Sequence, residues 1–121
     1  MSIPLTNYPL MPKSAKRDLL PGLLDLLILK CVATQAMHGY AIAQYLQSAT
    51  ADVIQVQEGS LYPALQRMRQ KGWIKAEWRT TPNNQRARYY MITTAGRKQL
   101  GEQQDGFTTL VTAVQRVLRL A

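Results

Sequence analysis

Apolar residues recur at steps of three and four between positions 16 and 34, which predicts a helix whose regular part starts near Pro21. These positions cover most of the helical circumference, so this helix should be buried in the core. A second helix is expected from His38 to Ser48. Its candidate inward residues are Tyr40, Ile42, Ala43 and Leu46. A third helix, from about Ser60 to Lys71, carries an amphipathic stripe of Leu61, Leu65 and Met68.

The ends of the third helix carry signals of their own. Ser60 can serve as the N-cap or lie in the first turn. Pro63 is expected in that first turn, where its missing N–H would have no helical partner. Gly72 should end the helix, because glycine readily adopts the left-handed conformation found after helix C-termini.

The hydrophobic period changes to two after Gly72. Residues 73–80 and 86–92 alternate apolar and polar positions, and the turn formers TPNNQ at 81–85 separate them. This pattern predicts a β-hairpin. One face of its first strand should carry Ile74, Ala76 and Trp78.

A last helix is expected to open near residues 93–96 and to continue to the C-terminus through two glycines. Its apolar residues form a two-in-seven stripe that is typical of a coiled-coil seam, with the polar Gln103 in register. The seam positions, which we interpret as dimerisation residues, are Leu100, Phe107, Leu110, Val114 and Val117.

Three helices followed by a hairpin are the layout of a winged helix-turn-helix domain, mainly α with a small β-hairpin (α+β). In this fold the third helix enters the major groove of DNA, and the hairpin reaches the backbone or the minor groove. We therefore expect an N-terminal arm over 1–15, flexible or partly docked, a winged helix-turn-helix over 16–94 and a C-terminal dimerisation helix over 95–121.

The distribution of charge favours a nucleic-acid partner. The chain has 15 Lys and Arg against 7 Asp and Glu, a net charge of +8. Nine of the basic and two of the acidic residues lie between Glu58 and Lys98, on the third helix, the hairpin and the start of the last helix. The clearest candidates for phosphate contacts are Arg67, Lys71, Arg79, Arg86 and Arg88.

Polar residues complete the set of candidate DNA contacts. Ser60, Tyr62 and Gln66 lie in the first half of the third helix, where a recognition helix usually touches bases. Tyr62 has an alternative interpretation as a half-buried packing aromatic. Asn84, between Asn83 and Gln85 at the hairpin tip, offers a neutral donor to the sugar-phosphate backbone.

Three separated motifs resemble the PadR family of bacterial transcriptional regulators. Residues 59–65 (GSLYPAL), followed by 72–74 (GWI), resemble the recognition-helix signature of that family. Residues 38–42 (HGYAI) resemble the entry to its second helix, and residues 88–96 resemble its second wing strand and the opening of its final helix. The resemblance spans about two-thirds of the chain, from about 20 to 100. The single short C-terminal helix resembles the compact subgroup of the family.

The resemblance implies a homodimeric DNA-binding protein that pairs chiefly through the C-terminal helix, with help from the N-terminal helix. Members of the family bind pseudo-palindromic operators, most are repressors, and several release DNA when an aromatic or cationic small molecule binds. We include Tyr40, in the second motif, among the DNA-contact candidates. One departure is Met68-Arg69, which stands where the family often has Leu-Glu and makes this helix more basic.

Other classes of function fit the sequence less well. The single cysteine and single histidine, Cys31 and His38, predict neither a disulfide framework nor a metal site, and Cys31 should be a small buried residue. No nucleophile–base pair or phosphate-binding glycine loop indicates an enzyme, and no cofactor is expected. The apolar stretch 19–33 is interrupted and too short for a bilayer, so we expect a cytoplasmic protein. A winged helix that docks a protein partner instead of DNA is the alternative.

Overall fold

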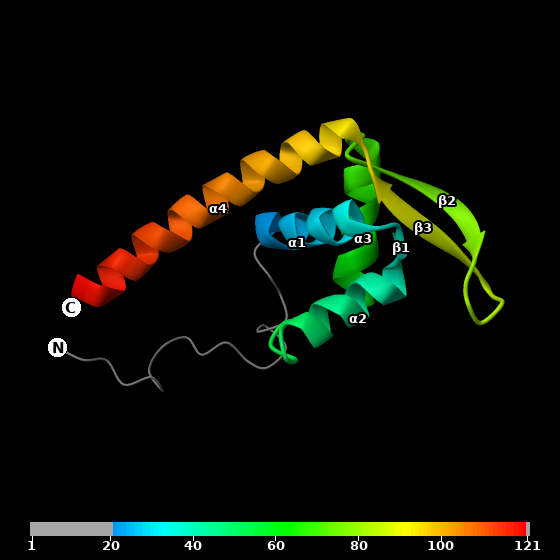
Figure 1. Cartoon of the computed structure of the whole chain (residues 1–121), viewed down its shortest axis with the longest axis horizontal. Helices are drawn as coiled ribbons and strands as arrows, with labels where there is room; N and C mark the ends of the chain where they lie inside the picture. Colours follow the sequence, from blue (N-terminus) through cyan, green and yellow to red (C-terminus); the bar gives the residue numbers. More distant parts are fainter. Residues whose placement is uncertain (1–20, 121) are drawn as a thin grey trace.

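The structure is a computed structural model that describes residues 21–120. Its elements follow the predicted order with one short strand added (Figure 1). They are α1 (Pro21–Thr34), β1 (Met37–His38), α2 (Gly39–Ala49), α3 (Glu58–Gln70), β2 (Ile74–Thr80), β3 (Arg86–Ile92) and α4 (Thr94–Leu120). The predicted α+β winged-helix fold is confirmed. The arm expected at residues 1–15 lies outside the described residues.

The core forms where the first three helices meet the base of the sheet. Ile28 and Leu29 of α1, Ile42 of α2 and Met68 of α3 are all fully buried. As predicted, α1 buries apolar residues around most of its circumference, because the other elements pack on several of its sides. This packing fixes α3 by one face and leaves its opposite face exposed.

The sheet is antiparallel with the strand order β1-β3-β2. β2 and β3 form the predicted hairpin, with Ile74 opposite Ile92 at its base. At its tip the Thr81 N–H donates to the Gln85 carbonyl, and Asn84 adopts a left-handed φ of 65°. The short β1 pairs with Tyr89 and Tyr90 in the middle of β3 and joins the hairpin to the start of α2. The sequence did not predict β1, because two residues are too few to show an alternating pattern.

The N-terminus of α3 lies earlier than predicted. The helix begins at Glu58 with Gln57 as N-cap, so Ser60 lies in the first turn. Pro63 therefore falls in the second turn, and its expected place in the first turn is wrong. A residue with an N–H at position 63 would donate to the Gly59 carbonyl. Gly59 is exposed, so solvent can satisfy that carbonyl instead.

The C-terminus of α3 ends at glycine as predicted. Gly72 has φ of +78° and follows the C-cap residue Lys71. The Gly72 N–H donates to the Arg69 carbonyl and the Trp73 N–H to the Met68 carbonyl, each at 3.0 Å. These two bonds form a Schellman motif, which satisfies the last carbonyls of the helix and turns the chain into β2.

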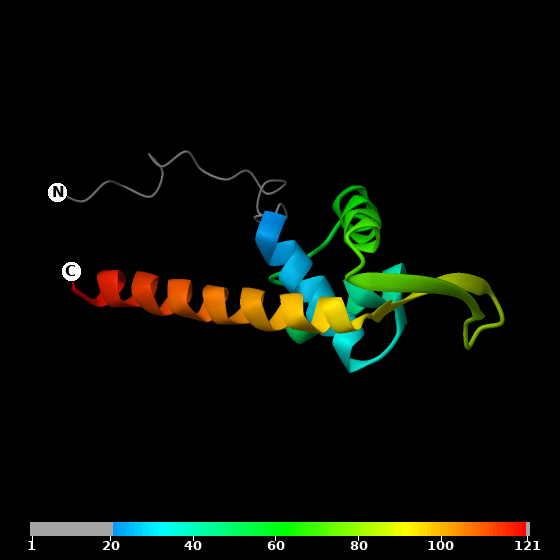
Figure 2. The ribbon, with the colours of Figure 1, turned by 90° about the horizontal axis from the view of Figure 1, so that it is seen from above.

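α4 starts at the base of the hairpin and projects away from the domain. The Thr93 hydroxyl caps it by accepting the Gly96 N–H at 3.0 Å. Beyond its contact with α1, the helix extends from the body, and its C-terminal end and the hairpin tip lie at opposite ends of the molecule (Figures 1 and 2). It runs through Gly101 and Gly106 without a break, as predicted. Within residues 21–120, no helix is both long and apolar enough to cross a membrane.

Candidate nucleic-acid interface

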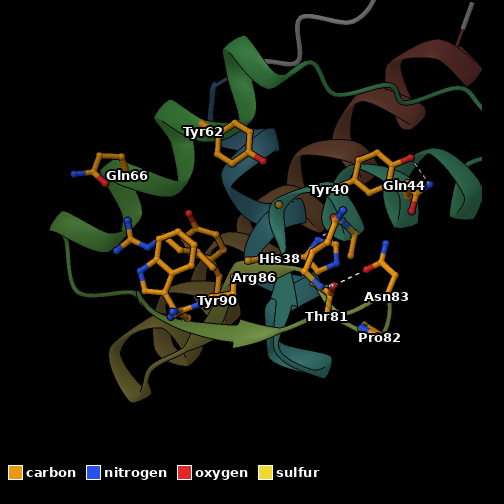
Figure 3. A pocket seen from close by; sticks show the side chains of 16 residues that line it. His38, Tyr40, Gln44, Tyr62, Gln66, Thr81, Pro82, Asn83, Arg86 and Tyr90 are labelled. Atoms are coloured by element: carbon orange, nitrogen blue, oxygen red, sulfur yellow. Dashed lines mark hydrogen bonds between the residues drawn. The ribbon is translucent and has the colours of Figure 1, made fainter.

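A groove of about 960 Å³ lies between the start of α2, the exposed face of α3 and the hairpin (Figure 3). Its lining includes five of the predicted DNA-contact residues: Tyr40, Tyr62, Gln66, Arg86 and Arg88. These residues come from three separate elements, so the fold brings them together. None of the side chains that line this groove is acidic. The groove therefore has the charge and the mixture of polar and aromatic groups that a nucleic acid requires.

The exposed face of α3 forms one wall of the groove. Tyr62 and Gln66 are one helical turn apart and both are exposed, whereas Leu61 and Leu65, the residues directly before each of them, are buried. Tyr62 is 44% exposed. Its ring also packs over Gly39, where an added Cβ would lie 2.8 Å from the tyrosine oxygen. Both interpretations of Tyr62 are therefore compatible: one part of the ring packs against α2, and the remainder faces the groove.

The hydroxyl of Tyr62 is a hydrogen-bond donor at neutral pH. Burial raises the pKa of Tyr62, and the negative charge of Glu58 raises it further. The side chain thus stays protonated. It can donate to an acceptor on a base edge or a phosphate.

The first turn of α2 forms a second wall. His38 is the N-cap, and its Nδ1 accepts the Ala41 N–H at 3.2 Å. Tyr40 is exposed, lines the groove, and accepts a hydrogen bond from the Gln44 amide at 2.9 Å. The expected inward orientation of Tyr40 is wrong, because Gly39, Ile42 and Leu46 form the buried stripe. Tyr40 follows Gly39 and is therefore rotated about 100° away from that stripe.

Arg67 connects the recognition helix to α1. Its Nη2 lies 2.5 Å from Oδ1 of Asp25, a residue that is only 7% exposed. The Arg67 side chain is itself 42% exposed, so its guanidinium borders solvent as well as Asp25. No sequence pattern predicts this pair, because the partners are 42 residues apart. Lys71, at the end of α3, is exposed, with its amino group 4.6 Å from the centre of the Trp73 ring.

The two faces of the hairpin differ in charge. Trp78, Arg86 and Arg88 all line the groove. On the other face, Arg79 pairs with Glu77 at 2.5 Å and lies over the ring of Tyr89. The positive charge of Arg79 is thus offset locally, and this residue lies outside the groove. Asn84 is exposed at the hairpin tip.

The groove residues that were not predicted as part of the site include His38, Gln44 and Trp78. For Gln44 the available signal was its position one helical turn after Tyr40. For Trp78 it was the alternation of β2, which places this ring on the same face as Ile74 but beyond the core. Neither signal points to DNA unless the hairpin is first placed beside α3.

Comparison with known proteins identifies the family of this chain. Residues 28–102 match the model of the family described as transcriptional regulator PadR-like. The chain belongs to the PadR family. It is accordingly a DNA-binding transcriptional regulator and not an enzyme. The resemblance of the three sequence motifs to this family is confirmed.

Relatives of known structure share this architecture. A PadR-like transcriptional regulator from Bacillus cereus is 29% identical, with a TM-score of 0.72 over 84% of this chain and 96% of its own. A putative transcriptional regulator from Thermoplasma acidophilum is 28% identical, with a TM-score of 0.69 over 82% and 93% of the two chains. A relative found by sequence comparison, an uncharacterized protein from Lysinibacillus sphaericus, is 31% identical over 87 residues, which cover 72% of this chain and 80% of the relative.

Proposed function

We propose that this PadR-family protein is a homodimeric repressor that binds a pseudo-palindromic operator, with one groove on each half-site. The observation that carries the proposal is the groove without acidic residues between α3 and the hairpin. In the complex, the sugar-phosphate backbone that separates a major groove from a minor groove of the DNA would lie along this protein groove. The recognition helix would then occupy the major groove, and the hairpin would reach across the strand.

The candidate contacts divide into two kinds. Ser60, Tyr62 and Gln66 would meet base edges, because Ser60 and Tyr62 lie in the first half of α3 and Gln66 follows Tyr62 by one helical turn. The remaining candidates would contact the sugar-phosphate backbone, and those of the hairpin would reach the adjoining minor groove as well. They are Tyr40, Arg67, Lys71, Asn84, Arg86 and Arg88.

The exposed face of α4 supports a dimer. Phe107, Leu110, Val114 and Val117 are all exposed and recur at steps of three and four. A row of this kind is stabilised when a second copy of the helix covers it. Leu100 differs from the other predicted seam residues, because it is already buried in the core of its own chain. We therefore place the start of the interface at Phe107.

The remaining parts of the proposal come from the family. A dimer bound at a promoter would block transcription by occupying it, and we place the protein in the cytoplasm with the chromosome that it binds. Release by a small-molecule effector is proposed on the resemblance to PadR regulators alone. We assign no residue to an effector site.

Selection from a pool of random DNA duplexes tests the proposal. The full chain is expected to enrich a sequence with two inverted half-sites about one helical turn apart, because two recognition helices must enter successive major grooves. Hydroxyl-radical footprinting of the selected duplex should then protect both half-sites. If no sequence is enriched over the starting pool, sequence-specific binding is contradicted.

A further inference from the structure

We infer that Trp78 determines specificity at this interface, because its indole holds Arg86 and Arg88 as a fixed pair that enters a narrow, A·T-rich minor groove. The inference rests on the proposed function, since it assumes that the groove-facing side of the hairpin meets duplex DNA. It adds a second source of sequence preference, separate from the base contacts of α3.

The strand register places these three side chains on one face. Trp78 lies directly opposite Arg88, and Thr80, two residues along β2, lies opposite Arg86. The guanidinium carbons of Arg86 and Arg88 are 5.6 and 5.8 Å from the centre of the Trp78 ring. Both arginines therefore make cation–π contacts with a single indole.

The aromatic ring in this arrangement, that of Trp78, is not part of the hydrophobic core. Ile74 is buried and Ala76 is half-buried, but Trp78, the next residue on this face, is 58% exposed. The hydrophobic core therefore ends before Trp78. Its ring instead lines the groove with the two arginines that it contacts.

The two arginines are also left without a neutralising partner in the groove. No acidic residue lines it, whereas Arg79 on the opposite face is paired with Glu77. The Arg88 Nε is buried and has no hydrogen-bond partner among the described residues. The Arg88 guanidinium is therefore partly dehydrated before DNA binds, so less water must be removed when it enters a narrow DNA groove.

A narrow minor groove is the DNA feature that suits such a pair. A-tracts narrow the minor groove and strengthen its negative potential, which attracts arginine. Residues i and i+2 of a strand are about 7 Å apart, so two stacked arginines can follow the groove floor along the DNA. A·T pairs also lack the amino group that G·C pairs place there. Trp78 would act by holding both arginines extended, which lowers the conformational entropy lost on binding.

The test compares three duplexes that share the selected operator and differ only in the base pairs under the hairpin, where footprinting locates minor-groove protection. These base pairs are A·T in the first duplex, G·C in the second and inosine·cytosine in the third. Inosine·cytosine keeps the major-groove groups of G·C but lacks its minor-groove amino group. Affinities are measured by fluorescence anisotropy for wild type, Trp78→Thr, Trp78→Phe and Lys75→Ala. Lys75 is the matched control, because it is an exposed cation of β2 on the opposite face of the hairpin.

Wild type should bind the A·T and inosine·cytosine duplexes alike, and roughly fivefold to tenfold more tightly than the G·C duplex. Trp78→Thr keeps a β-branched strand residue and should reduce this preference to less than about twofold. Trp78→Phe should retain most of the preference and Lys75→Ala all of it. Thermal melting by circular dichroism confirms that each variant is folded.

Two results would overturn the inference while leaving the proposed function intact. One is an unchanged A·T preference in Trp78→Thr. The other is wild-type binding to inosine·cytosine that is as weak as binding to G·C, which would place the readout in the major groove. Failure of wild type to bind the selected operator at all would overturn the proposed function as well.

Discussion

At the scale of single residues, the ion pair between Asp25 and Arg67 is the clearest link between the recognition helix and the core. Asp25 is a buried carboxylate, and Arg67 is the residue that offsets its charge. Arg67→Ala should lower the free energy of unfolding by about 1–3 kcal/mol, because it leaves Asp25 dehydrated and unpaired. Urea denaturation measures the change.

The double variant Asp25→Asn/Arg67→Ala provides the control for this prediction. It removes both charges, so part of the lost stability should return, whereas any DNA contact made by Arg67 stays absent. The thermodynamic cycle over the single and double variants therefore gives the coupling of the pair. A coupling energy near zero would contradict a stabilising role for this contact.

Cys31 shows how burial affects one ionisable group. It is buried in α1, as predicted, and burial raises the pKa of its thiol from 9.0 to about 11. The unfolded chain loses this proton near pH 9, whereas the folded chain holds it until about pH 11. The folded state therefore loses relative stability as the pH rises through this window.

Urea midpoints measured at about pH 8 and about pH 10.5 test this pH dependence, because the two values lie on either side of the ordinary thiol pKa. The decrease in midpoint should be larger for wild type than for Cys31→Ala, which has no thiol to ionise. An equal decrease in both proteins would assign the alkaline loss of stability to other groups.

At the scale of elements, the helix ends decide where the recognition helix lies. Gly72→Ala should destabilise the protein by about 1 kcal/mol, because alanine at φ of +78° is strained. Gly59→Ala is the matched control. Gly59 lies in the first turn of α3, has no positive φ, and an added Cβ there would meet no atom within 4 Å. This substitution should be neutral or slightly stabilising in the same denaturation assay.

The elements also differ in how well their sequences predict them. α1, the hairpin and α4 follow from long periodic patterns, and Gly72 marks the end of α3. The start of α3 was misplaced because Glu58 and Gly59 carry no apolar periodicity and Ser60 resembles a cap. β1 exists only because β3 pairs with it, so no local pattern predicts it.

The residues of the candidate site also divide into those that the sequence predicts and those that it does not. Tyr62, Gln66, Arg86 and Arg88 could be predicted, because the order of elements places the recognition helix and hairpin on one surface. The stacking of Trp78 against two arginines could not, since it depends on the register of two strands. Nor could the pairing of Arg67 with Asp25, which depends on how α3 packs against α1.

At the scale of the whole molecule, the exposed stripe of α4 predicts a dimer. Val114→Glu should shift the protein toward the monomer, because it places a carboxylate in the centre of the proposed seam. Thr112→Glu adds the same charge on the opposite side of the helix and should leave the assembly unchanged. Light scattering with size-exclusion chromatography measures the mass over a range of concentrations. A wild-type protein that stays monomeric at high concentration would contradict the dimer.

The salt dependence of operator binding most directly tests whether the basic groove is the DNA-binding surface. In anisotropy titrations of wild type and Arg88→Ala at increasing salt, the logarithm of the association constant should fall linearly with the logarithm of the salt concentration. Each lost phosphate contact should reduce the slope by about 0.9, so the variant dimer should show a slope shallower by about one to two. A wild-type affinity that does not change with salt, or an Arg88→Ala slope equal to that of wild type, would contradict an interface formed by α3 and the hairpin.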